Sequence, residues 1–362
     1  MKLNRIIISG GGTGGHIYPA LAIADALQAR VPNARIRFVG GYGKMEMEKV
    51  PQAGYPIHGI WIDGFQRKRS LRNLLFPLKL GVSLWQAFFY LIRFRPQLVV
   101  GTGGFASGPL VFVASIFRVP SLIQEQNSFP GITNRLLGRI VNKIAVSYPG
   151  MESFFPADKI VVTGNPTRKE ISNKNIKSEV AKSFFGGNPK QKTLVILGGS
   201  LGAKRINTLV AEKLPLFDNL GWQLIWQCGK LYYDQFQSLA SSKSIIRPFI
   251  KEMDQLYAAA DLIISRAGAS TISELAQVGK PVLFIPSPNV AEDHQMKNAQ
   301  AFVAQDAAWV LAEKDLNSSF DDTFIALATD EALCATLGAN IERLARPNAV
   351  EAIINEIETL TS

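Results

Sequence analysis

Short apolar segments alternate with longer, more polar segments along the whole chain. Apolar runs of about four to eight residues are typical of buried strands, and helical segments between them are typical of βα units. The predicted strands are residues 5–9, 35–40, 96–101, 120–124, 143–147, 159–164, 193–199, 222–228, 244–250, 261–266, 281–286 and 307–312. Strands that alternate with helices favour parallel sheets covered on both faces, so the pattern predicts an α/β fold with doubly wound sheets.

The spacing of these strands divides the chain into two similar halves. A polar, glycine-bearing stretch at residues 165–192 separates them, and residues 193–210 repeat the order of strand, glycine turn and helix with which the chain opens. A chain of 362 residues also exceeds what one hydrophobic core normally supports. We therefore expect two Rossmann-like domains facing a cleft, residues 1–164 and 165–341, with a C-terminal helix at about 342–362 that packs back on the first.

Five glycines surround Thr13 at residues 10–15, directly between the first predicted strand and the first predicted helix. Glycine costs conformational entropy, so such a run indicates a sharp turn that approaches something closely. At the amino terminus of a helix that partner is commonly an anion. Similar turns follow two other strands, at residues 101–108 and 198–202. Ligands of doubly wound folds bind at the carboxyl ends of the strands, so three such turns predict a diphosphate ligand.

Two familiar nucleotide motifs fail in detail. Gly10, Gly12 and Gly15 satisfy the dinucleotide pattern G-x-G-x-x-G. That motif also needs an acidic residue at the end of the second strand to hold the ribose, and no acid follows that strand before Glu46. The turn at residues 198–205 lacks the Gly-Lys-Ser/Thr ending of a P-loop. The missing ribose acid counts against a nicotinamide-dependent dehydrogenase.

The net charge of +10 is distributed unevenly, because no Asp or Glu occurs between Asp63 and Glu125. The cations of this interval are Arg67, Lys68, Arg69, Arg72, Lys79, Arg93, Arg95 and Arg118. The aromatic residues among them include Phe76, Trp85, Phe88, Phe89 and Tyr90. Basic, aromatic, amphipathic segments bind anionic lipid head groups, so the interval predicts contact with an anionic membrane surface. The alternative is an ordinary core helix preceded by a solvated basic loop.

Composition argues against several other classes. A nucleic-acid partner is disfavoured, because the basic interval contains no recognisable binding module and is too apolar. Cys228 and Cys334 are too few for a disulfide framework or a zinc site, which fits a reducing cytosol. The sequence has neither a signal-peptide pattern nor the roughly 18–20 apolar residues of a membrane span, so we expect a soluble or peripheral protein. It also lacks an Asp-x-Asp pair, so we expect neither a metal nor a cofactor.

Seven motifs occur in the order that is characteristic of one enzyme family. Extending from Gly10 to about Ala299, they are GGTGGHIYPALAIA, GTGGFASGP, EQNSFPGITNRLL, VTGNPTR, GGSLGAKRIN, SRAGASTISELAQVGKP and DHQMKNA. On these motifs the chain resembles the MurG family, the N-acetylglucosaminyltransferases of peptidoglycan synthesis. The resemblance implies two Rossmann-like domains of glycosyltransferase-B architecture. It also implies inverting transfer of GlcNAc from UDP-GlcNAc to the 4-hydroxyl of lipid-linked MurNAc-pentapeptide, at the cytoplasmic face of the bacterial inner membrane.

The resemblance also implies roles for individual residues. Contacts with the donor UDP-GlcNAc are implied for Thr13, Gly14, Gly15, Asn127, Arg168, Ser200, Ile250, Ala269, Ser270, Thr271, Glu274, Gln295 and Asn298. The acceptor diphosphate is implied to bind Gly101, Thr102, Gly103, Gly104 and Ser107. Some of these positions have a purely structural alternative. Thr271 and Glu274 have the spacing of a capping box, and Ser200 could be a plain helix N-cap.

The catalytic base has two candidates. His16 lies at the start of the first predicted helix, where the helix dipole lowers the pKa of the imidazole and keeps it neutral, although a histidine there could equally cap the turn. Glu125 is the rival. The neighbouring Gln124 replaces a histidine that the family commonly has, which weakens any mechanism that needs one there. Another UDP-sugar enzyme of this architecture, such as a UDP-GlcNAc 2-epimerase, is the alternative function, and it would need no membrane surface.

Overall fold

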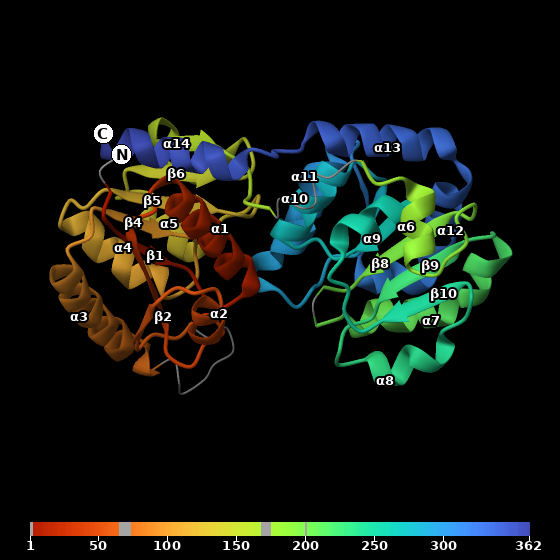
Figure 1. The fold of residues 1–362 in the computed structure, drawn as a ribbon, viewed down its shortest axis with the longest axis horizontal. Coiled ribbons are helices and arrows are strands. Elements are labelled where there is room, and N and C mark those ends of the chain that lie inside the picture. Colours follow the sequence, from red (N-terminus) through yellow and green to blue (C-terminus); the bar gives the residue numbers. More distant parts are fainter. Residues whose placement is uncertain (1–2, 65–73, 168–174, 200) are drawn as a thin grey trace. The chain divides into compact units, whose positions relative to one another are not determined.

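The computed structural model describes residues 3–64, 74–167, 175–199 and 201–362. The chain divides into two compact units. The first is formed by residues 1–167 together with 348–362, and the second by residues 168–347 (Figure 1). Each unit is built on one parallel sheet.

The sheet of the first unit has seven strands in the order β3-β2-β1-β4-β5-β6-β7. They are β1 (Arg5–Ser9), β2 (Arg35–Gly41), β3 (Ile57–Ile60), β4 (Leu98–Gly101), β5 (Ser121–Glu125), β6 (Lys143–Val146) and β7 (Ile160–Val162). In the register, Ile8 of β1 lies opposite Phe38 on one side and Val100 on the other. The strand order reverses between β1 and β4, so their carboxyl ends are where a doubly wound sheet binds its ligand.

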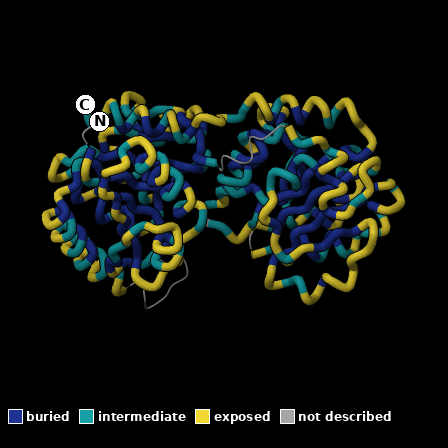
Figure 2. The backbone as a smooth tube through the Cα atoms, in the orientation of Figure 1, coloured by how far each residue is buried: buried dark blue, intermediate teal, exposed yellow. Residues whose placement is uncertain are grey.

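Helices cover both faces of this sheet. They are α1 (Gly14–Arg30), α2 (Glu46–Gln52), α3 (Phe76–Phe94), α4 (Ser107–Ile116), α5 (Ile132–Leu137) and α14 (Ala349–Thr361). Ile6 and Ile8 of β1 belong to the core formed with α1 and α14, whereas Ile7 belongs to the core formed with α3 and α4. Figure 2 shows the central strands as buried along their length. This burial on both faces explains why the strands are continuous apolar runs in the sequence.

The second unit has a six-stranded parallel sheet in the order β10-β9-β8-β11-β12-β13. Its strands are β8 (Thr193–Leu197), β9 (Gln223–Gln227), β10 (Ser244–Arg247), β11 (Leu262–Ser265), β12 (Val282–Phe284) and β13 (Trp309–Val310). Its helices are α6 (Ser178–Phe184), α7 (Lys204–Asn219), α8 (Tyr233–Phe236), α9 (Met253–Ala259), α10 (Ala269–Val278), α11 (His294–Val303), α12 (Leu316–Thr329) and α13 (Glu331–Arg343). The order reverses between β8 and β11, whose carboxyl ends are the corresponding ligand edge.

Every strand predicted from the apolar pattern occurs in the structure, and one further strand does not follow from that pattern. This strand is β3, whose sequence IHGI is short and interrupted by a histidine and a glycine. β3 lies at the edge of its sheet, and the ring of His58 stacks on Tyr90 of α3 with centroids 4.4 Å apart. An edge strand need not be apolar on both faces, so it leaves a weaker signal in the sequence.

No single helix within the described ranges is both long enough and apolar enough to cross a membrane. The consecutive stretches Glu313–Thr329 and Glu331–Arg343 would pass such a test together by length and composition, but they are bent by 90° at their junction. Phe320 and Phe324 of the first stretch are fully buried in the core of the second unit.

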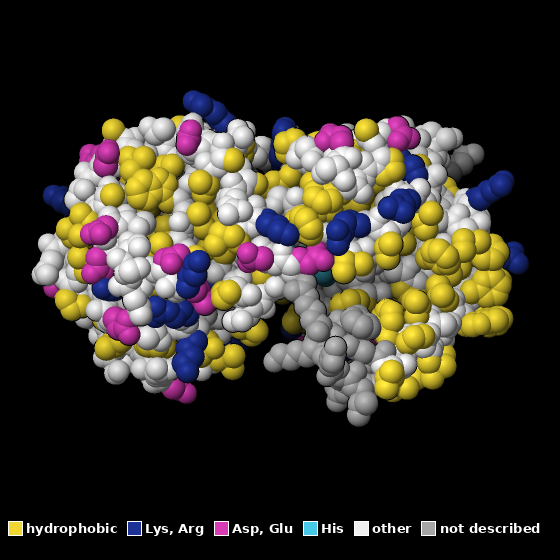
Figure 3. Space-filling view, turned by 180° about the vertical axis from the view of Figure 1, so that it is seen from behind, with side chains coloured by type: hydrophobic (Ala, Val, Ile, Leu, Met, Phe, Trp, Pro, Cys, Tyr) yellow, Lys and Arg dark blue, Asp and Glu magenta, His cyan; other side chains and the backbone are white. Residues whose placement is uncertain are grey.

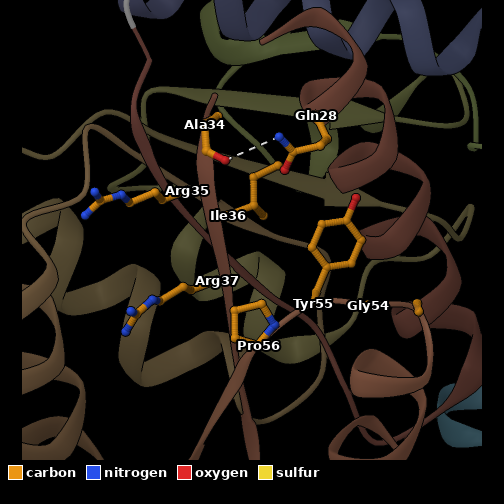
Figure 4. Close-up of a pocket in the computed structure, with 9 residues that line it drawn as sticks. Gln28, Ala34, Arg35, Ile36, Arg37, Gly54, Tyr55 and Pro56 are labelled. Carbon is orange, nitrogen blue, oxygen red and sulfur yellow. Dashed lines mark hydrogen bonds between the residues drawn. The ribbon is translucent and has the colours of Figure 1, made fainter. Parts of the chain in front are cut away.

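A cavity of about 480 Å³ opens beside β2 in the first unit (Figure 4). Its lining residues are Gln28, Ala34, Arg35, Ile36, Arg37, Ala53, Gly54, Tyr55 and Pro56. Two of its polar side chains form hydrogen bonds within the protein. Gln28 Nε2 donates to the Ala34 carbonyl at 3.3 Å, and Tyr55 Oη donates to Asp25 at 2.7 Å. The cavity lies at the amino end of β2, whereas doubly wound sheets bind ligands at the opposite, carboxyl edge.

Candidate active site

Two glycine turns pack against each other at the carboxyl edge of the first sheet. The Gly11 amide donates to the Gly103 carbonyl at 3.3 Å, and Thr102 Oγ1 donates to the His16 carbonyl at 2.7 Å. Gly104 has a left-handed φ of 84°, and a Cβ there would collide with the Gly11 carbonyl. Glycine is therefore required at Gly104 by contact between two parts of the protein, before any ligand is considered.

His16 lies in the first turn of α1, which begins at Gly14 after the N-cap Thr13. Its Nδ1 lies 2.9 Å from the Gly11 carbonyl oxygen. A carbonyl only accepts hydrogen bonds, so Nδ1 carries the proton and Nε2 keeps its lone pair. Burial lowers the pKa of His16, which outweighs the opposing effects of the Gly11 carbonyl and of the Glu46 charge. A neutral imidazole with a free lone pair on Nε2 can accept a proton.

Glu125 ends β5 and is 2% exposed. One carboxylate oxygen accepts the backbone amide and the side-chain Nδ2 of Asn127, at 3.0 and 3.1 Å. The other accepts the Gly131 amide at 3.2 Å and Asn134 Nδ2 at 2.9 Å. Burial raises the pKa of Glu125, and these four donors act against that shift. Both oxygens are engaged in holding the loop between β5 and α5, which favours a structural role for Glu125 over that of a base.

Asn134 was not among the residues predicted for the site. It is 2% exposed, and its Nδ2 donates to Glu125. A Cβ built on Gly103 would lie 3.1 Å from His16 Nε2 and 3.6 Å from Asn134 Nδ2. The side chains of His16 and Asn134 therefore both lie close to Gly103. Asn134 thus lies between the two base candidates. The sequence offered no periodic or spacing signal for it beyond its place in the EQNSFPGITNRLL motif.

The predicted acceptor-diphosphate residues Gly101, Thr102, Gly103, Gly104 and Ser107 lie together in the second glycine turn. The hydroxyls of Thr102 and Ser107 are fully buried and donate to the carbonyls of His16 and Gly104. These hydroxyls therefore hold the turn in place. Since Gly101 is a buried residue of β4, Gly103 and Gly104 are the parts of the turn that lie beyond the strand, beside His16.

Gln124 belongs to a buried amide network. Its Nε2 donates to Asn165 Oδ1 at 2.9 Å, and Asn165 Nδ2 donates to the Gln126 carbonyl at the same distance. Gln126 Nε2 in turn donates to the Thr102 carbonyl at 2.8 Å. These buried polar groups satisfy one another, and Gln126 links Asn165 to the second glycine turn.

In the second unit, α10 presents its amino terminus beyond the carboxyl end of β11. The helix begins at Ala269 after the N-cap Gly268, so Ala269, Ser270 and Thr271 form its first turn. The amides of a first turn have no acceptor within the helix and attract anions. The capping-box interpretation of Thr271 and Glu274 is wrong, because that motif places its glutamate at the third helical position and Glu274 is the sixth.

Glu274 is 8% exposed, and the hydroxyl of Tyr257 from α9 donates to its carboxylate at 3.3 Å. The structural alternative for this residue is therefore a packing contact with α9. Ile250, after β10, is 3% exposed. Its amide donates to Gln227 Oε1 at 2.8 Å, and Gln227 Nε2 donates to the Gly199 carbonyl at 3.2 Å. Gln227 was not predicted for the site, although it joins the third glycine turn to Ile250.

The remaining residues of the second unit that are predicted to contact UDP-GlcNAc differ in how far their side chains are buried. Gln295 of α11 is partly buried, and its Oε1 accepts the Ser287 amide at 2.9 Å. Asn298, one turn later, is fully buried, and its Nδ2 lies 3.5 Å from the Ala267 carbonyl before α10. Arg168 and Ser200 lie outside the described residues.

Comparison with known proteins gives the class of this fold. The chain matches the glycosyltransferase family 28 N-terminal domain over residues 6–146 and the C-terminal domain over residues 193–331. A curated relative from Flavobacterium psychrophilum is 52% identical over 99% of this chain and 98% of its own length. Its name is UDP-N-acetylglucosamine--N-acetylmuramyl-(pentapeptide) pyrophosphoryl-undecaprenol N-acetylglucosamine transferase.

Solved structures agree with this assignment. The crystal structure of MurG from Acinetobacter baumannii matches with a TM-score of 0.80 and 28% identity, over 98% of this chain and 99% of that chain. A UDP-GlcNAc 2-epimerase from Neisseria meningitidis bound to UDP-GlcNAc matches with a TM-score of 0.65, over 99% of this chain and all of that one. Its sequence identity is 14%, so this second likeness shows the fold alone.

The two doubly wound parallel sheets, each with glycine turns at its carboxyl edge, form the glycosyltransferase-B architecture, and the family match makes the protein a glycosyltransferase. The chain belongs to glycosyltransferase family 28. The predicted fold class, the predicted transferase class and the resemblance to the MurG family are confirmed.

Proposed function

We propose that this enzyme transfers GlcNAc from UDP-GlcNAc to undecaprenyl-diphosphate-linked MurNAc-pentapeptide, converting lipid I to lipid II in peptidoglycan synthesis. Two relatives that are 52% and 51% identical to this chain over almost its whole length are named for this activity. The observation in the structure that carries the proposal is the hydrogen bond from His16 Nδ1 to the Gly11 carbonyl. It leaves Nε2 as a proton acceptor at the ligand edge of the first sheet.

The donor side of the mechanism belongs to the second unit. The first-turn amides of α10 supply hydrogen-bond donors and the positive end of a helix dipole for the diphosphate of UDP-GlcNAc. In this proposal the ribose hydroxyls donate to Glu274, and the uracil packs against the segment at Ile250, as the family resemblance implies. These amides also stabilise the negative charge that develops on UDP as it leaves, which lowers the barrier to transfer.

The transfer is a single displacement with inversion at the sugar carbon. The acceptor hydroxyl oxygen forms the new bond to C1 of GlcNAc while the bond from C1 to the UDP oxygen breaks. The hydroxyl proton passes to Nε2 of His16, and the electron pair of the broken bond leaves with UDP. His16 is preferred to Glu125 as the base, because the oxygens of Glu125 already accept four N–H donors.

The acceptor side belongs to the first unit. The side chains of Thr102 and Ser107 are engaged internally, so the acceptor diphosphate is expected to meet the backbone of the second turn at Gly103 and Gly104. Thr13, Gly14 and Gly15, which the resemblance implies contact the donor UDP-GlcNAc, also belong to this unit: Thr13 is the N-cap of α1, and the two glycines lie in its first turn. Asn127 is predicted to contact UDP-GlcNAc. Its side chain already donates to a Glu125 oxygen, so it must leave that oxygen in order to donate to the ligand.

An apolar face on the first unit suits an acceptor that is anchored in a bilayer. Helix α3 buries one side, including Ala87 and Leu91, and exposes a stripe on the other. The exposed stripe consists of Leu78, Trp85, Phe89 and Ile92, with Phe112, Ile116 and Phe117 of the α4 region nearby. We call this set the α3–α4 apolar face. Hydrophobic side chains gather on this unit at the right of Figure 3.

We propose that the α3–α4 apolar face rests on the anionic cytoplasmic surface of the inner membrane, making this a peripheral enzyme. Arg93 and Arg118 are exposed beside the face and add the positive charge that anionic head groups attract. The cluster of Arg67, Lys68, Arg69 and Arg72, which was also predicted to contact lipid, lies outside the described residues. Contiguous apolar surface of this kind normally marks an interaction site.

The test is a radiolabel transfer assay with labelled UDP-GlcNAc and a short-chain lipid-linked MurNAc-pentapeptide, with chelator present. Label in the lipid product supports the proposal. Binding of UDP-GlcNAc without transfer would reject the acceptor, and conversion of UDP-GlcNAc to its 2-epimer would instead establish the epimerase activity. His16→Ala should lower kcat by about 100-fold or more, since general bases contribute about that much. Glu125→Gln should act mainly through stability.

A further inference from the structure

Glu46 is a buried carboxylate to which the mechanism above assigns no role. It is the first residue of α2, just beyond the carboxyl end of β2, and it is 1% exposed. Burying a carboxylate is costly unless its oxygens are hydrogen-bonded. Here Oε1 accepts the Gly41 amide and Oε2 accepts the Gly12 amide, each at 2.9 Å.

The glycines on either side leave room for this carboxylate. A Cβ on Gly11 would collide with the carboxylate oxygens, and a Cβ on Gly40 would lie 2.5 Å from Glu46 Cγ. Both positions therefore need glycine for Glu46 to reach its two amides. Part of the glycine run at residues 10–15 thus accommodates a protein side chain, in addition to any ligand.

The first glycine turn is consequently held from two sides. On the side of β4, the Gly11 amide bonds to Gly103 and Thr102 bonds to the His16 carbonyl. On the side of β2, the Glu46 carboxylate accepts the Gly12 amide. Gly12 has a φ of 83°, in the region that glycine alone adopts readily, so an unrestrained turn has other conformations available.

We infer that Glu46 is a positioning residue for the transfer reaction: its carboxylate fixes the first glycine turn so that His16 Nε2 and the first-turn amides of α1 meet the substrates in one geometry. The inference rests on the proposed function. Catalytic groups act through such preorganisation, and a displacement of about 1 Å can lower the rate by about 100-fold. Glu46 itself touches neither substrate.

Glu46 also acts on His16 through its charge. The carboxylate raises the pKa of His16, against the larger lowering that burial causes. The other acidic group on the described elements around His16 is Glu125 of β5, which lies beyond Gly103 and Asn134 and accepts four N–H donors of its own. Removing the Glu46 charge should therefore lower the pKa of His16 further.

The kinetic test compares Glu46→Gln with Glu48→Gln, an exposed carboxylate of the same helix that bonds to Lys49 and Gln52. Glutamine has the same shape but presents one N–H₂ group to two amide donors. A charged hydrogen bond lost in this way predicts a fall in kcat of about 10- to 100-fold, with KM for UDP-GlcNAc little changed. Glu48→Gln should behave as wild type, and equal kcat values for all three proteins would overturn the inference.

A second measurement needs no turnover. The chain has three histidines. The NMR signal of His16 is the histidine signal that is missing from the spectrum of His16→Ala, and its titration can then be followed. Glu46→Gln should move this titration to lower pH, whereas Glu46→Asp should keep the titration close to wild type while still lowering kcat. An unmoved titration in Glu46→Gln would overturn the inference even if the transferase is active. If the wild-type protein has no transferase activity but the His16 titration still moves to lower pH in Glu46→Gln, only the proposed reaction is rejected. Loss of folding in both variants would reduce Glu46 to a structural residue.

Discussion

At the scale of single residues, Gly12 and Gly104 show that two glycines with the same backbone conformation can be required for different reasons. Their φ angles are 83° and 84°. Nothing lies within 4 Å of a Cβ built on Gly12, whereas a Cβ on Gly104 collides with the Gly11 carbonyl. Gly12→Ala should therefore cost about 1–2 kcal/mol from the left-handed conformation alone. Gly104→Ala should cost clearly more, measured by urea unfolding, and equal midpoints would contradict this account.

His16 makes the stability of the first unit depend on pH. The pKa of His16 is lowered in the folded protein by burial, so the unfolded chain, with a pKa near 6.5, binds the proton more readily. The free energy of unfolding should consequently fall as the pH is lowered through about 6.5, and should continue to fall until the pKa of the folded protein is reached. His16→Gln should flatten this dependence in thermal unfolding experiments. A slope identical to that of wild type would show that His16 is not the group responsible.

Glu125 illustrates the limit of residue-scale prediction. Its position at the end of a strand in the EQN motif made it a candidate base. Only the folded loop brings Asn127, Gly131 and Asn134 to its two oxygens. Burial raises the pKa of Glu125, but both of its oxygens are occupied by these N–H donors, so neither is left to accept the proton of a substrate hydroxyl.

At the scale of elements, α3 is a helix with two apolar sides. The interpretation as an ordinary core helix holds for one side only, since that side packs into the core and the other is exposed, and contact of the exposed side with a membrane stays a prediction. Trp85 and Phe89 lie one turn apart on the exposed side, 64% and 60% accessible. Replacing both by Glu should lower binding to anionic liposomes by well over tenfold, since each buried aromatic contributes about 1.5–3 kcal/mol. UDP-GlcNAc binding should be unaffected.

Sedimentation with liposomes measures this effect. The matched control is Phe184→Glu on α6 of the second unit, where a similarly exposed phenylalanine (56% accessible) lies outside the proposed face. If Trp85 and Phe89 variants sediment as wild type does, the α3–α4 apolar face has another partner.

At the scale of the whole molecule, the end of the chain completes the core of the first unit. Ile353, Ile354 and Ile357 of α14 are buried with Ile17, Ile23 and other residues of α1. Ile357→Ala should cost about 2–5 kcal/mol, whereas Thr359→Ala on the exposed side should stay within about 0.5 kcal/mol. Because each unit has its own core, calorimetry should show that Ile357→Ala moves the transition of the first unit only. Movement of both transitions would mean that the units unfold together.

The sequence by itself determined the α/β class, the strands buried on both faces and the glycine turns that follow them. These features form local patterns: a continuous apolar run and a cluster of glycines after it can be recognised in the sequence without knowledge of their distant partners. Edge strand β3 escaped because a strand with one protected face can include polar residues.

Only the tertiary structure decided what the polar residues do. It assigned the Thr102 and Ser107 hydroxyls to internal bonds, removed Glu274 from a capping box and brought Glu46 to the amide of Gly12, 34 positions earlier. A hydrogen bond depends on distances of a few tenths of an ångström between groups far apart in the chain, and no periodicity encodes such distances. The sequence therefore predicted the kind of site. Only the folded structure shows which polar residues hold the site together and which are left to take part in the reaction.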